Sequence, residues 1–556
     1  MSGPVIRRAY ERFAATVDRF IVWLEKDHLP LSAIFLMVLV VALVRDLLEY
    51  YLLDQAFVTT VHPWLYSIAH HMGFYIVVFM GLVFLLSAFS GRGIRRSINY
   101  VSTFFWIIIL PPILDYLAGS RQNYAYFSWT DFINALFHFS GSGFHIGQAI
   151  EVIIILFAIF SYVVWTQRAS WFSVSDRTIL LIRVSLLIVF TFIFMFFMGT
   201  PATFLPVDPF AFPNYESTKY YQYHLFFFAY YLLAGVLLAL ALTYLATKGN
   251  FRKVIRSMRL PQTMFFGAIV TAGVAMGWQL NSNASLITQI TQTPYWVNLA
   301  FAGVAIIAAV MAWQVSTIWN DVSDKQWDEP TRGDRLLAAG LIDNRILIQI
   351  SLILVSVAVL SSLLLSLLQM MIIILILLLS YVYSFKPVRF KKHILSPMLI
   401  GLGTFFAFVF GFLTPFSVVA TVSGSQGTIA YLTGDVAMPQ LTAEAFYVGF
   451  FMFAGLVIGS MVTDIEGYQE DVNAGVRTIY TVFGMQRGKR VVGFLIFLGA
   501  LMPLFLFSTL MDDFVFPLLG FAAMLLFWQT GRSRSVIVIA LLGLLYAAIS
   551  FLGLIG

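Results

Sequence analysis

Two acid-rich clusters each follow a long apolar segment of this chain. The first runs from Asn320 to Asp328, and the second runs from Asp464 to Asp471. Acidic residues are scarce in a chain that is 60% hydrophobic and 11% charged, so two such clusters indicate a function. Carboxylates that gather at a membrane surface repel one another unless a cation lies among them, and Mg²⁺ prefers oxygen ligands and commonly bridges substrate phosphates. The clusters therefore predict a divalent metal site that binds a phosphate-bearing substrate.

The spacing within the clusters suits a helix. Asn320, Asp324 and Asp328 recur every four residues, and Asp321 precedes Asp324 by three, so all four can share one broad helical face. In the second cluster, Asp464 and Asp471 are two helical turns apart. The predicted metal ligands are Asn320, Asp321, Asp324, Asp328, Asp464 and Asp471, and the five aspartates are also the predicted catalytic residues.

Basic residues lie in the same predicted loops as the two acid clusters. A metal that neutralises the developing charge, together with Arg and Lys side chains that hold the oxygens, suits a diphosphate leaving group. We expect Mg²⁺ as the cofactor, with Mn²⁺ as a substitute. The predicted diphosphate-binding cations are Arg335, Lys386, Arg389, Lys391 and Arg477.

Hydropathy predicts an all-α, polytopic membrane protein. The 556 residues have a mean hydropathy of +0.88, and apolar stretches long enough to cross a bilayer recur along the whole chain. There is no cysteine, which excludes disulfides and thiolate metal sites. The net charge of +6 is explained by basic loops that face anionic lipid, so no nucleic-acid partner is expected. Fifteen transmembrane helices are predicted, starting near residues 31, 72, 100, 148, 178, 222, 262, 295, 345, 367, 396, 444, 490, 513 and 535.

The positive charges predict the orientation of the chain. If the N-terminus is cytoplasmic and the chain crosses fifteen times, 29 of the 33 Lys and Arg residues fall on the cytoplasmic side. Both acid clusters then lie on that side, and the C-terminus lies outside. No cleavable signal peptide is expected, because the first thirty residues are charged and amphipathic.

A basic segment divides the chain into two parts of different character. Six predicted helices with long outer loops precede it, and nine helices with long, charged inner loops follow it. We expect a cytoplasmic amphipathic segment (1–30), a six-helix transmembrane module (31–247), a basic interfacial linker (248–261) and a second transmembrane domain (262–556).

The motifs of the second part resemble the UbiA-type intramembrane prenyltransferase superfamily over roughly residues 260–556. The first acid cluster fits the NDxxDxxxD motif of that family, and Tyr383 to Lys391 fits its YSxxPxRxK loop. The run from Asp464 to Asp471, followed by Gly475-Val476-Arg477-Thr478-Ile479, fits its second motif. The chain departs from the usual pattern at Gly467, where many members carry an acid.

The resemblance implies a nine-helix bundle and a Mg²⁺-assisted reaction. An isoprenyl diphosphate would lose its diphosphate, and a lipid or aromatic acceptor within the membrane would capture the allylic cation. The resemblance also adds Tyr383 to the predicted diphosphate-binding residues. The expected partners are an isoprenyl diphosphate, a lipophilic or aromatic acceptor and membrane lipid. Two alternatives remain open: phosphoribosyl transfer to a polyprenyl phosphate, and a non-catalytic lipid carrier or scramblase on the same fold.

The six-helix module carries no motif that identifies a reaction. Six histidines fall near its outer face, where residues of the interfacial belt are the simpler interpretation and a metal or acid–base site is the alternative. Asp115, Glu151 and Arg183 lie within or near apolar helices, and such groups usually pair inside a bundle or line a polar cavity. The six histidines are His62, His70, His71, His138, His145 and His224.

Overall fold

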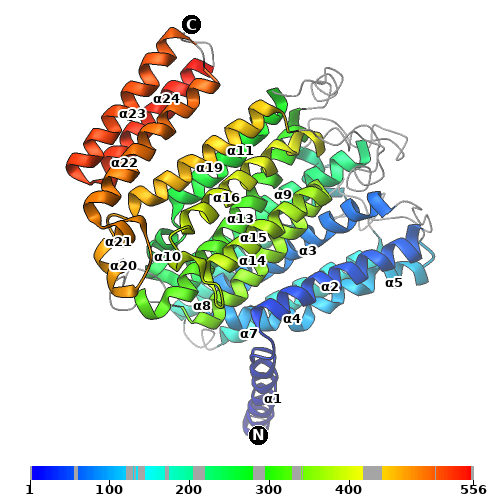
Figure 1. Cartoon of the computed structure of the whole chain (residues 1–556). Coiled ribbons are helices and arrows are strands. Elements are labelled where there is room, and N and C mark those ends of the chain that lie inside the picture. Colours follow the sequence, from blue (N-terminus) through cyan, green and yellow to red (C-terminus); the bar gives the residue numbers. More distant parts are fainter. Residues whose placement is uncertain are drawn as a thin grey trace. The chain divides into compact units, whose positions relative to one another are not determined.

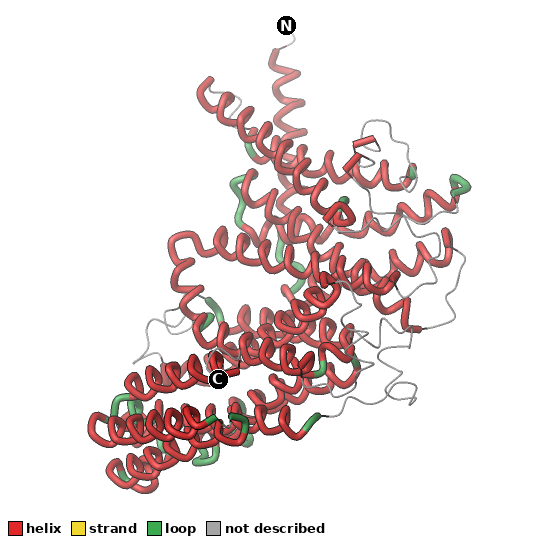
Figure 2. Tube along the Cα trace, turned by 90° about the horizontal axis from the view of Figure 1, so that it is seen from above, coloured by secondary structure: helices red, strands yellow, loops and turns green. Residues whose placement is uncertain are grey.

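Every element that the structure describes is a helix (Figure 2). The computed structural model describes residues 3–54, 61–120, 129–130, 133–134, 145–168, 174–204, 219–279, 295–328, 340, 342–417, 441–507 and 509–551. The predicted all-α class is therefore confirmed for these residues.

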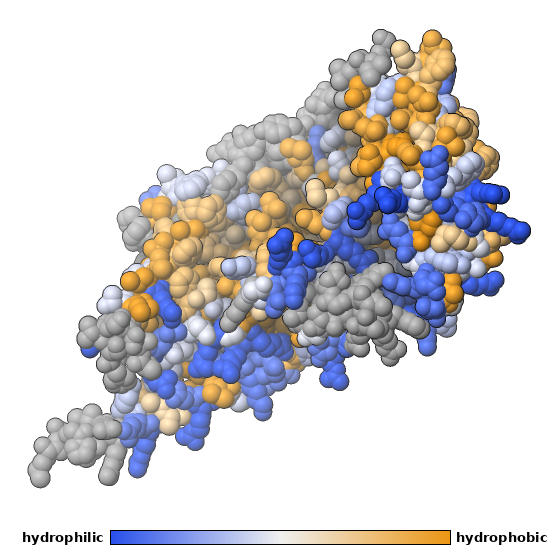
Figure 3. Space-filling view, turned by 90° about the vertical axis from the view of Figure 1, so that its left-hand side faces the viewer, coloured by the Kyte–Doolittle hydropathy of each residue, from blue (hydrophilic) through white to orange (hydrophobic). Residues whose placement is uncertain are grey.

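The helices have the length and composition of membrane spans. Fourteen of them, among the described residues, are long and apolar enough to cross a bilayer. A shorter apolar stretch, Ser533–Ala547, lies where the fifteenth span was expected. Apolar side chains also cover broad areas of the surface (Figure 3), as lipid-facing surfaces require. The chain is a multi-pass integral membrane protein.

The chain forms two compact units, the first containing residues 1–256 and the second beginning at Ser257 (Figure 1). The first unit contains α1 (Gly3–Leu24), α2 (Leu31–Glu49), the π-helical turn η1 (Tyr50–Asp54), α3 (Val61–Phe89), α4 (Ile94–Phe104), the 3₁₀ turn η2 (Phe105–Ile109), α5 (Leu110–Leu117), α7 (Ile146–Thr166), α8 (Val174–Gly199), η4 (Pro201–Phe204), α9 (Lys219–Thr247), η6 (Lys248–Asn250) and α10 (Phe251–Ser257), the last of which reaches the boundary.

The core of the first unit is built by helices α1 to α4, the turn η2, and helices α7 and α8. Val41 and Ala42 of α2, Leu86 of α3 and Val163 of α7 are essentially inaccessible to solvent within it. Helix α3 packs along α9 and against α2, and α5 packs against α7. A buried carboxylate links the end of α1 to α7: Glu25, directly after α1, accepts a hydrogen bond of 2.7 Å from the hydroxyl of Tyr162 in α7.

The second unit contains the segments that carry the acid clusters. Its elements are α11 (Leu260–Gln279), α13 (Tyr295–Asp328), α14 (Asn344–Leu365), α15 (Leu367–Ser384), the 3₁₀ turn η7 (Phe390–Lys392), α16 (Ser396–Phe412), α19 (Ala443–Thr463), α20 (Tyr468–Ala474), α21 (Ile479–Phe483), α22 (Met485–Leu501), η8 (Met502–Phe505), α23 (Leu510–Thr530) and α24 (Ser533–Phe551).

Glycines allow α11 and α16 to approach closely. A Cβ atom at Gly273 would lie 2.3 Å from the carbonyl oxygen of Phe408, and one at Gly411 would lie 2.1 Å from that of Val270. Small residues at helix contacts favour association in membranes, because they let backbones meet where no hydrophobic driving force acts. Helix α16 packs on its other side against α19, so the two glycines bring α19 and its acidic end into the bundle.

Helix α13 is long enough to carry its acidic end out of the hydrocarbon. It has 34 residues, which corresponds to about 51 Å at 1.5 Å per residue, whereas the apolar core of a bilayer is about 30 Å thick. Its apolar part is lined by alanines, and Ala308, Ala309 and Ala312 are fully buried where α14, α15 and α11 pack against it. The last turns, which hold Asn320 to Asp328, can therefore lie at the membrane surface.

Candidate functional site

The acidic end of α13 is surrounded by three cations from two segments of the second unit. Arg259, directly before α11, places Nη2 2.6 Å from Oδ1 of Asp321. Arg389 places Nη2 3.3 Å from Oδ1 of Asp324, and Nζ of Lys391 contacts the same oxygen. All of these side chains are at most about one-third exposed, so their charges interact in a partly desolvated setting.

The loop after α15 presents two of these cations. It leaves the helix at Ser384 and turns back, because the N–H of Arg389 donates a hydrogen bond of 2.8 Å to the carbonyl oxygen of Phe385. Nη2 of Arg389 also donates to the carbonyl oxygen of Ser323, at 3.1 Å. Lys391 donates from Nζ to Oγ of Ser323, at 2.6 Å, and lies 3.5 Å from Oδ1 of Asn320. The loop is thus fastened to the face of α13 that carries the acid cluster.

Two of the three cations have strained backbones. Arg259 has a φ of 49° and Arg389 has a φ of 44°, and they are the two non-glycine residues with positive φ among those that the structure describes. The left-handed conformation costs a residue with a side chain roughly 1–2 kcal/mol. Such strain persists where the surroundings fix it, and it gathers at binding and catalytic sites. Both arginines contact carboxylates of α13, so the strain coincides with this site.

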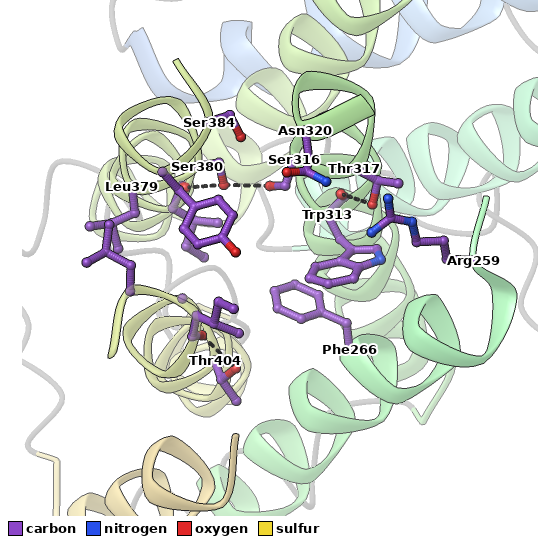
Figure 4. A pocket seen from close by; sticks show the side chains of 15 residues that line it. Arg259, Phe266, Trp313, Ser316, Thr317, Asn320, Leu379, Ser380, Ser384 and Thr404 are labelled. Carbon is purple, nitrogen blue, oxygen red and sulfur yellow. Dashed lines mark hydrogen bonds between the residues drawn. The ribbon is translucent and has the colours of Figure 1, made fainter. Parts of the chain in front are cut away.

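A cavity of about 180 Å³ adjoins the acid cluster (Figure 4). Arg259 and Asn320 line it together with hydroxyl groups, and Oγ of Ser316 and Oγ of Ser380 lie 2.5 Å apart within it. Apolar and aromatic side chains make most of the remaining wall. They include Phe266 and Trp313, whose rings stack with centroids 5.1 Å apart. Tyr383 also lines the cavity, as do Ile376, Leu379, Leu399 and Ile400.

The second acid cluster begins where α19 ends. Asp464 is the C-cap residue of α19, and Asp471 lies in the short helix α20. Burial, and then repulsion by the Asp471 carboxylate, raise the pKa of Asp464 to about 7. Tyr383 interacts electrostatically with Asp464 and Asp471 of the second cluster and with Asp324 of the first. Both acid clusters therefore lie within electrostatic reach of this one side chain.

The predicted site residues differ in how the structure places them. Asn320, Asp321, Asp324, Arg389 and Lys391 come together as described above. Lys386 and Arg477 have exposed side chains and form no ion pair with an acidic residue among those described, although the backbone N–H of Arg477 donates to the carbonyl oxygen of Lys392, at 3.0 Å. Arg335 and the side chain of Asp328 lie outside the described residues.

The chemistry of these donors fits a hard divalent cation, although no ready-made cage is present. Within the described ranges, no group of three or more His, Asp or Glu side chains has the geometry to hold a metal. All of the candidate ligands nevertheless offer oxygen atoms, as Mg²⁺ requires. Among the described residues, no cation forms an ion pair with the carboxylate of Asp464, and burial together with the Asp471 carboxylate raises its pKa.

Arg259 is a residue of the site that the sequence did not reveal. Its basic segment suggested an interfacial linker, and no spacing linked it to the acid cluster. The available signal was its position, one residue before the first helix of the second unit and two residues before Pro261, a residue favoured in the first helical turn. The contact with Asp321 depends on the packing of α11 along α13.

Comparison with known proteins identifies the family of this part of the chain. Residues 284–537 match the model of the UbiA prenyltransferase family. The match includes both acid clusters and the loop that carries Arg389 and Lys391. This part of the chain therefore belongs to the UbiA prenyltransferase family, and prenyl transfer is its class of reaction. No match was found among functionally curated proteins.

Solved structures show similarity at low sequence identity. One is described as a digeranylgeranylglyceryl phosphate synthase in membranes, with 14% identity over 55% of this chain and 96% of that chain, and a TM-score of 0.36. Another is a UbiA homologue from Archaeoglobus fulgidus bound to DMAPP and Mg²⁺, with 14% identity over 54% of this chain and 98% of that one, and a TM-score of 0.35.

Proposed function

We propose that this protein transfers an isoprenyl group from a prenyl diphosphate to a lipid or aromatic acceptor within the membrane, in a Mg²⁺-dependent reaction. The observation that carries the proposal is that the charged cluster and the cavity share two residues. Arg259 and Asn320 contact the other charged side chains and also line the wall of the cavity. A diphosphate at the charged end would thus have a hydrocarbon-lined space beside it.

The cations Arg259, Arg389 and Lys391 are proposed to hold the diphosphate. In the structure they are bound to Asp321 and Asp324, so their side chains are held near the place where the anion would lie. Two guanidinium groups also offer the fork of N–H donors that suits phosphate oxygens. Lys386, Arg477 and Arg335 remain proposed members of the same group.

The carboxylates are proposed to hold the metal. Asp321, Asp324 and Asp328 would do so from α13, with Asn320 beside them, and the second group would be Asp464 and Asp471. Bound Mg²⁺ supplies charge neutralisation of the diphosphate oxygens and of the leaving group. Asp464 supports this role, because burial and the neighbouring Asp471 carboxylate both disfavour its charged form, and a bound cation would offset both effects.

The cavity is proposed to hold the first isoprene units of the substrate. In the reaction the bond between the allylic carbon and the diphosphate oxygen breaks, and both electrons leave with the diphosphate. Trp313 and Phe266, whose rings line the cavity, can stabilise the allylic cation through their π faces. The acceptor then supplies the electron pair for the new bond and loses a proton. An apolar cavity of this kind favours a prenyl chain over a phosphoribosyl group.

The arrangement in the membrane is also proposed. The basic loops support a cytoplasmic N-terminus, a cytoplasmic active site and an outer C-terminus. Residues 262–556 are proposed to form the catalytic domain, joined by the linker 248–261 to the six-helix module.

The experiment uses the full-length protein in lipid nanodiscs with Mg²⁺. Labelled prenyl diphosphates of several chain lengths are supplied with lipid and aromatic acceptors, and the products are identified by mass spectrometry. Turnover should fall at least 100-fold in Lys391→Met, and Lys253→Met, at an exposed lysine of α10, should match the wild type. Thermal unfolding of each variant checks the fold. A folded protein that releases no diphosphate from any of these substrates would contradict the proposal.

A further inference from the structure

The first unit gathers ionisable side chains from five helices at one end. The set lies where α2 ends, where α5 ends, and near the beginnings of α3, α7 and α9. Charged groups inside a membrane bundle are costly and therefore usually functional. Arg183 of α8 is distant from this set, because it donates to Gln167, beyond the opposite end of α7. The members are Arg45, Asp46 and Glu49 of α2, His70 and His71 of α3, Asp115 of α5, Glu151 of α7 and His224 of α9.

One pair in this set joins a carboxylate to an imidazole. Nδ1 of His71 contacts Oδ1 of Asp46 across the packed helices α2 and α3. The side chain of Asp46 is 2% exposed, whereas that of His71 is 23% exposed. The carboxylate is therefore shielded, and the imidazole is the more accessible member of the pair.

A second pair joins two imidazoles. Nδ1 of His224 lies 2.7 Å from Nδ1 of His70, which is 1% exposed. A nitrogen–nitrogen contact of this length requires a donor on one side and an acceptor on the other. The two Nδ1 atoms therefore share one proton. The His70 ring also contacts the His71 ring, with centroids 3.9 Å apart, so the two pairs adjoin.

The surrounding charges favour the binding of protons. Arg45 and Glu49 form an ion pair of 2.9 Å. Asp115 accepts the backbone N–H of Gly147, at 2.6 Å, and Glu151 interacts electrostatically with Arg45, Asp115 and Glu49. Among the described residues, this set thus holds four carboxyl groups and one guanidinium. Bound protons offset such an excess of negative charge, and histidine is the side chain that takes them up near neutral pH.

We propose that Asp46, His70, His71 and His224 form a buried proton-binding site in the first unit. The proton is the ligand, His71 is the entry point, and the imidazole pair shares a proton beside it. A metal fits less well, because no group of three or more metal-ligating side chains with suitable geometry occurs among the described residues. This proposal does not rest on the proposed prenyl transfer.

The test is performed on the full-length protein in nanodiscs. Histidines are labelled with ¹⁵N, and imidazole signals are followed between pH 8 and pH 5. Wild type should show a nitrogen–nitrogen coupling through the shared proton, which His70→Gln and His224→Gln should each abolish. His28→Gln is the matched control, because His28 is exposed and lies against the carbonyl oxygen and the ring of Trp23, and it contacts no member of the set among the described residues. This control should keep the coupling.

A proton count gives the second readout. Back-titration from pH 8 to pH 5 should show that His71→Gln takes up about one proton per chain fewer than wild type, since one titrating imidazole is lost. Two results would overturn the proposal: an unchanged proton count in folded His71→Gln, or stoichiometric binding of added Zn²⁺ that this substitution removes. Glutamine keeps a polar group at each position, and thermal unfolding identifies any variant that fails to fold. If His71→Gln fails, His71→Asn is measured in the same way.

Discussion

Asp324→Asn tests whether the charge of the α13 cluster drives catalysis. The substitution keeps the size of the side chain and an oxygen that can still accept hydrogen bonds from Lys391 and Arg389. It removes the negative charge that these two cations contact and that the bound metal would need. We therefore expect a loss of turnover without a loss of fold.

The expected magnitude rests on the strength of the contact and on the typical cost of losing one electrostatic contribution to catalysis. At 3.3 Å, the attraction between Arg389 and Asp324 is about 5 kcal/mol before desolvation, for an effective dielectric constant of about 20. If Asp324 holds the metal, its loss weakens the stabilisation that the metal gives to the charge developing on the diphosphate. Loss of one such electrostatic contribution typically costs about 3–4 kcal/mol, so kcat should fall roughly 100- to 1000-fold. The KM for the prenyl diphosphate should change by only a few-fold, because Lys391 and Arg389 remain able to bind its oxygens.

The assay is release of diphosphate at saturating Mg²⁺ and substrate. Asp343→Asn is the matched control, because Asp343 is an exposed N-cap of α14 and contacts none of the site residues that the structure describes. It should retain wild-type kcat, since asparagine also caps helices well. A kcat for folded Asp324→Asn within threefold of wild type would refute the role of this carboxylate. A large rise in KM with unchanged kcat would instead assign it to substrate binding alone.

Four further predictions concern the metal, the helix packing, the topology and the module boundary. A chelator should abolish diphosphate release, and added Mg²⁺ or Mn²⁺ should restore it. Gly411→Ala should lower stability by about 1–3 kcal/mol in thermal unfolding, because its Cβ would meet the α11 backbone, whereas Gly459→Ala, with open space around it, should not. A cysteine at Gln486 should react with impermeant reagents only from the cytoplasm, and one at Leu510 only from outside; the reverse would indicate a wrong helix count. A shortened chain that starts at Lys248 should insert and keep measurable diphosphate release, and a folded but inert product would place part of the active site in the first unit.

The sequence alone determined the class of the protein and the acidic part of the site. Long apolar segments predict helices because a bilayer leaves no other partner for backbone polar groups, and each of the fifteen expected positions corresponds to an apolar helix. The four-residue spacing of Asn320 and Asp324 is a local property of one helix, so it could be read without knowledge of packing. The motifs around them also indicated the UbiA family before any contact was known.

Only the tertiary structure decided which cations meet those acids. Arg259 is 62 positions from Asp321, and its contact depends on the packing of two helices and on a left-handed backbone conformation that no spacing predicts. Lys386 and Arg389 are close in sequence, yet only Arg389 reaches Asp324, because the turn after α15 sets the direction of each side chain. The contacts between His70, His71 and His224 arise in the same way. Local patterns reveal which groups share a helix face, whereas packing between helices determines which faces meet.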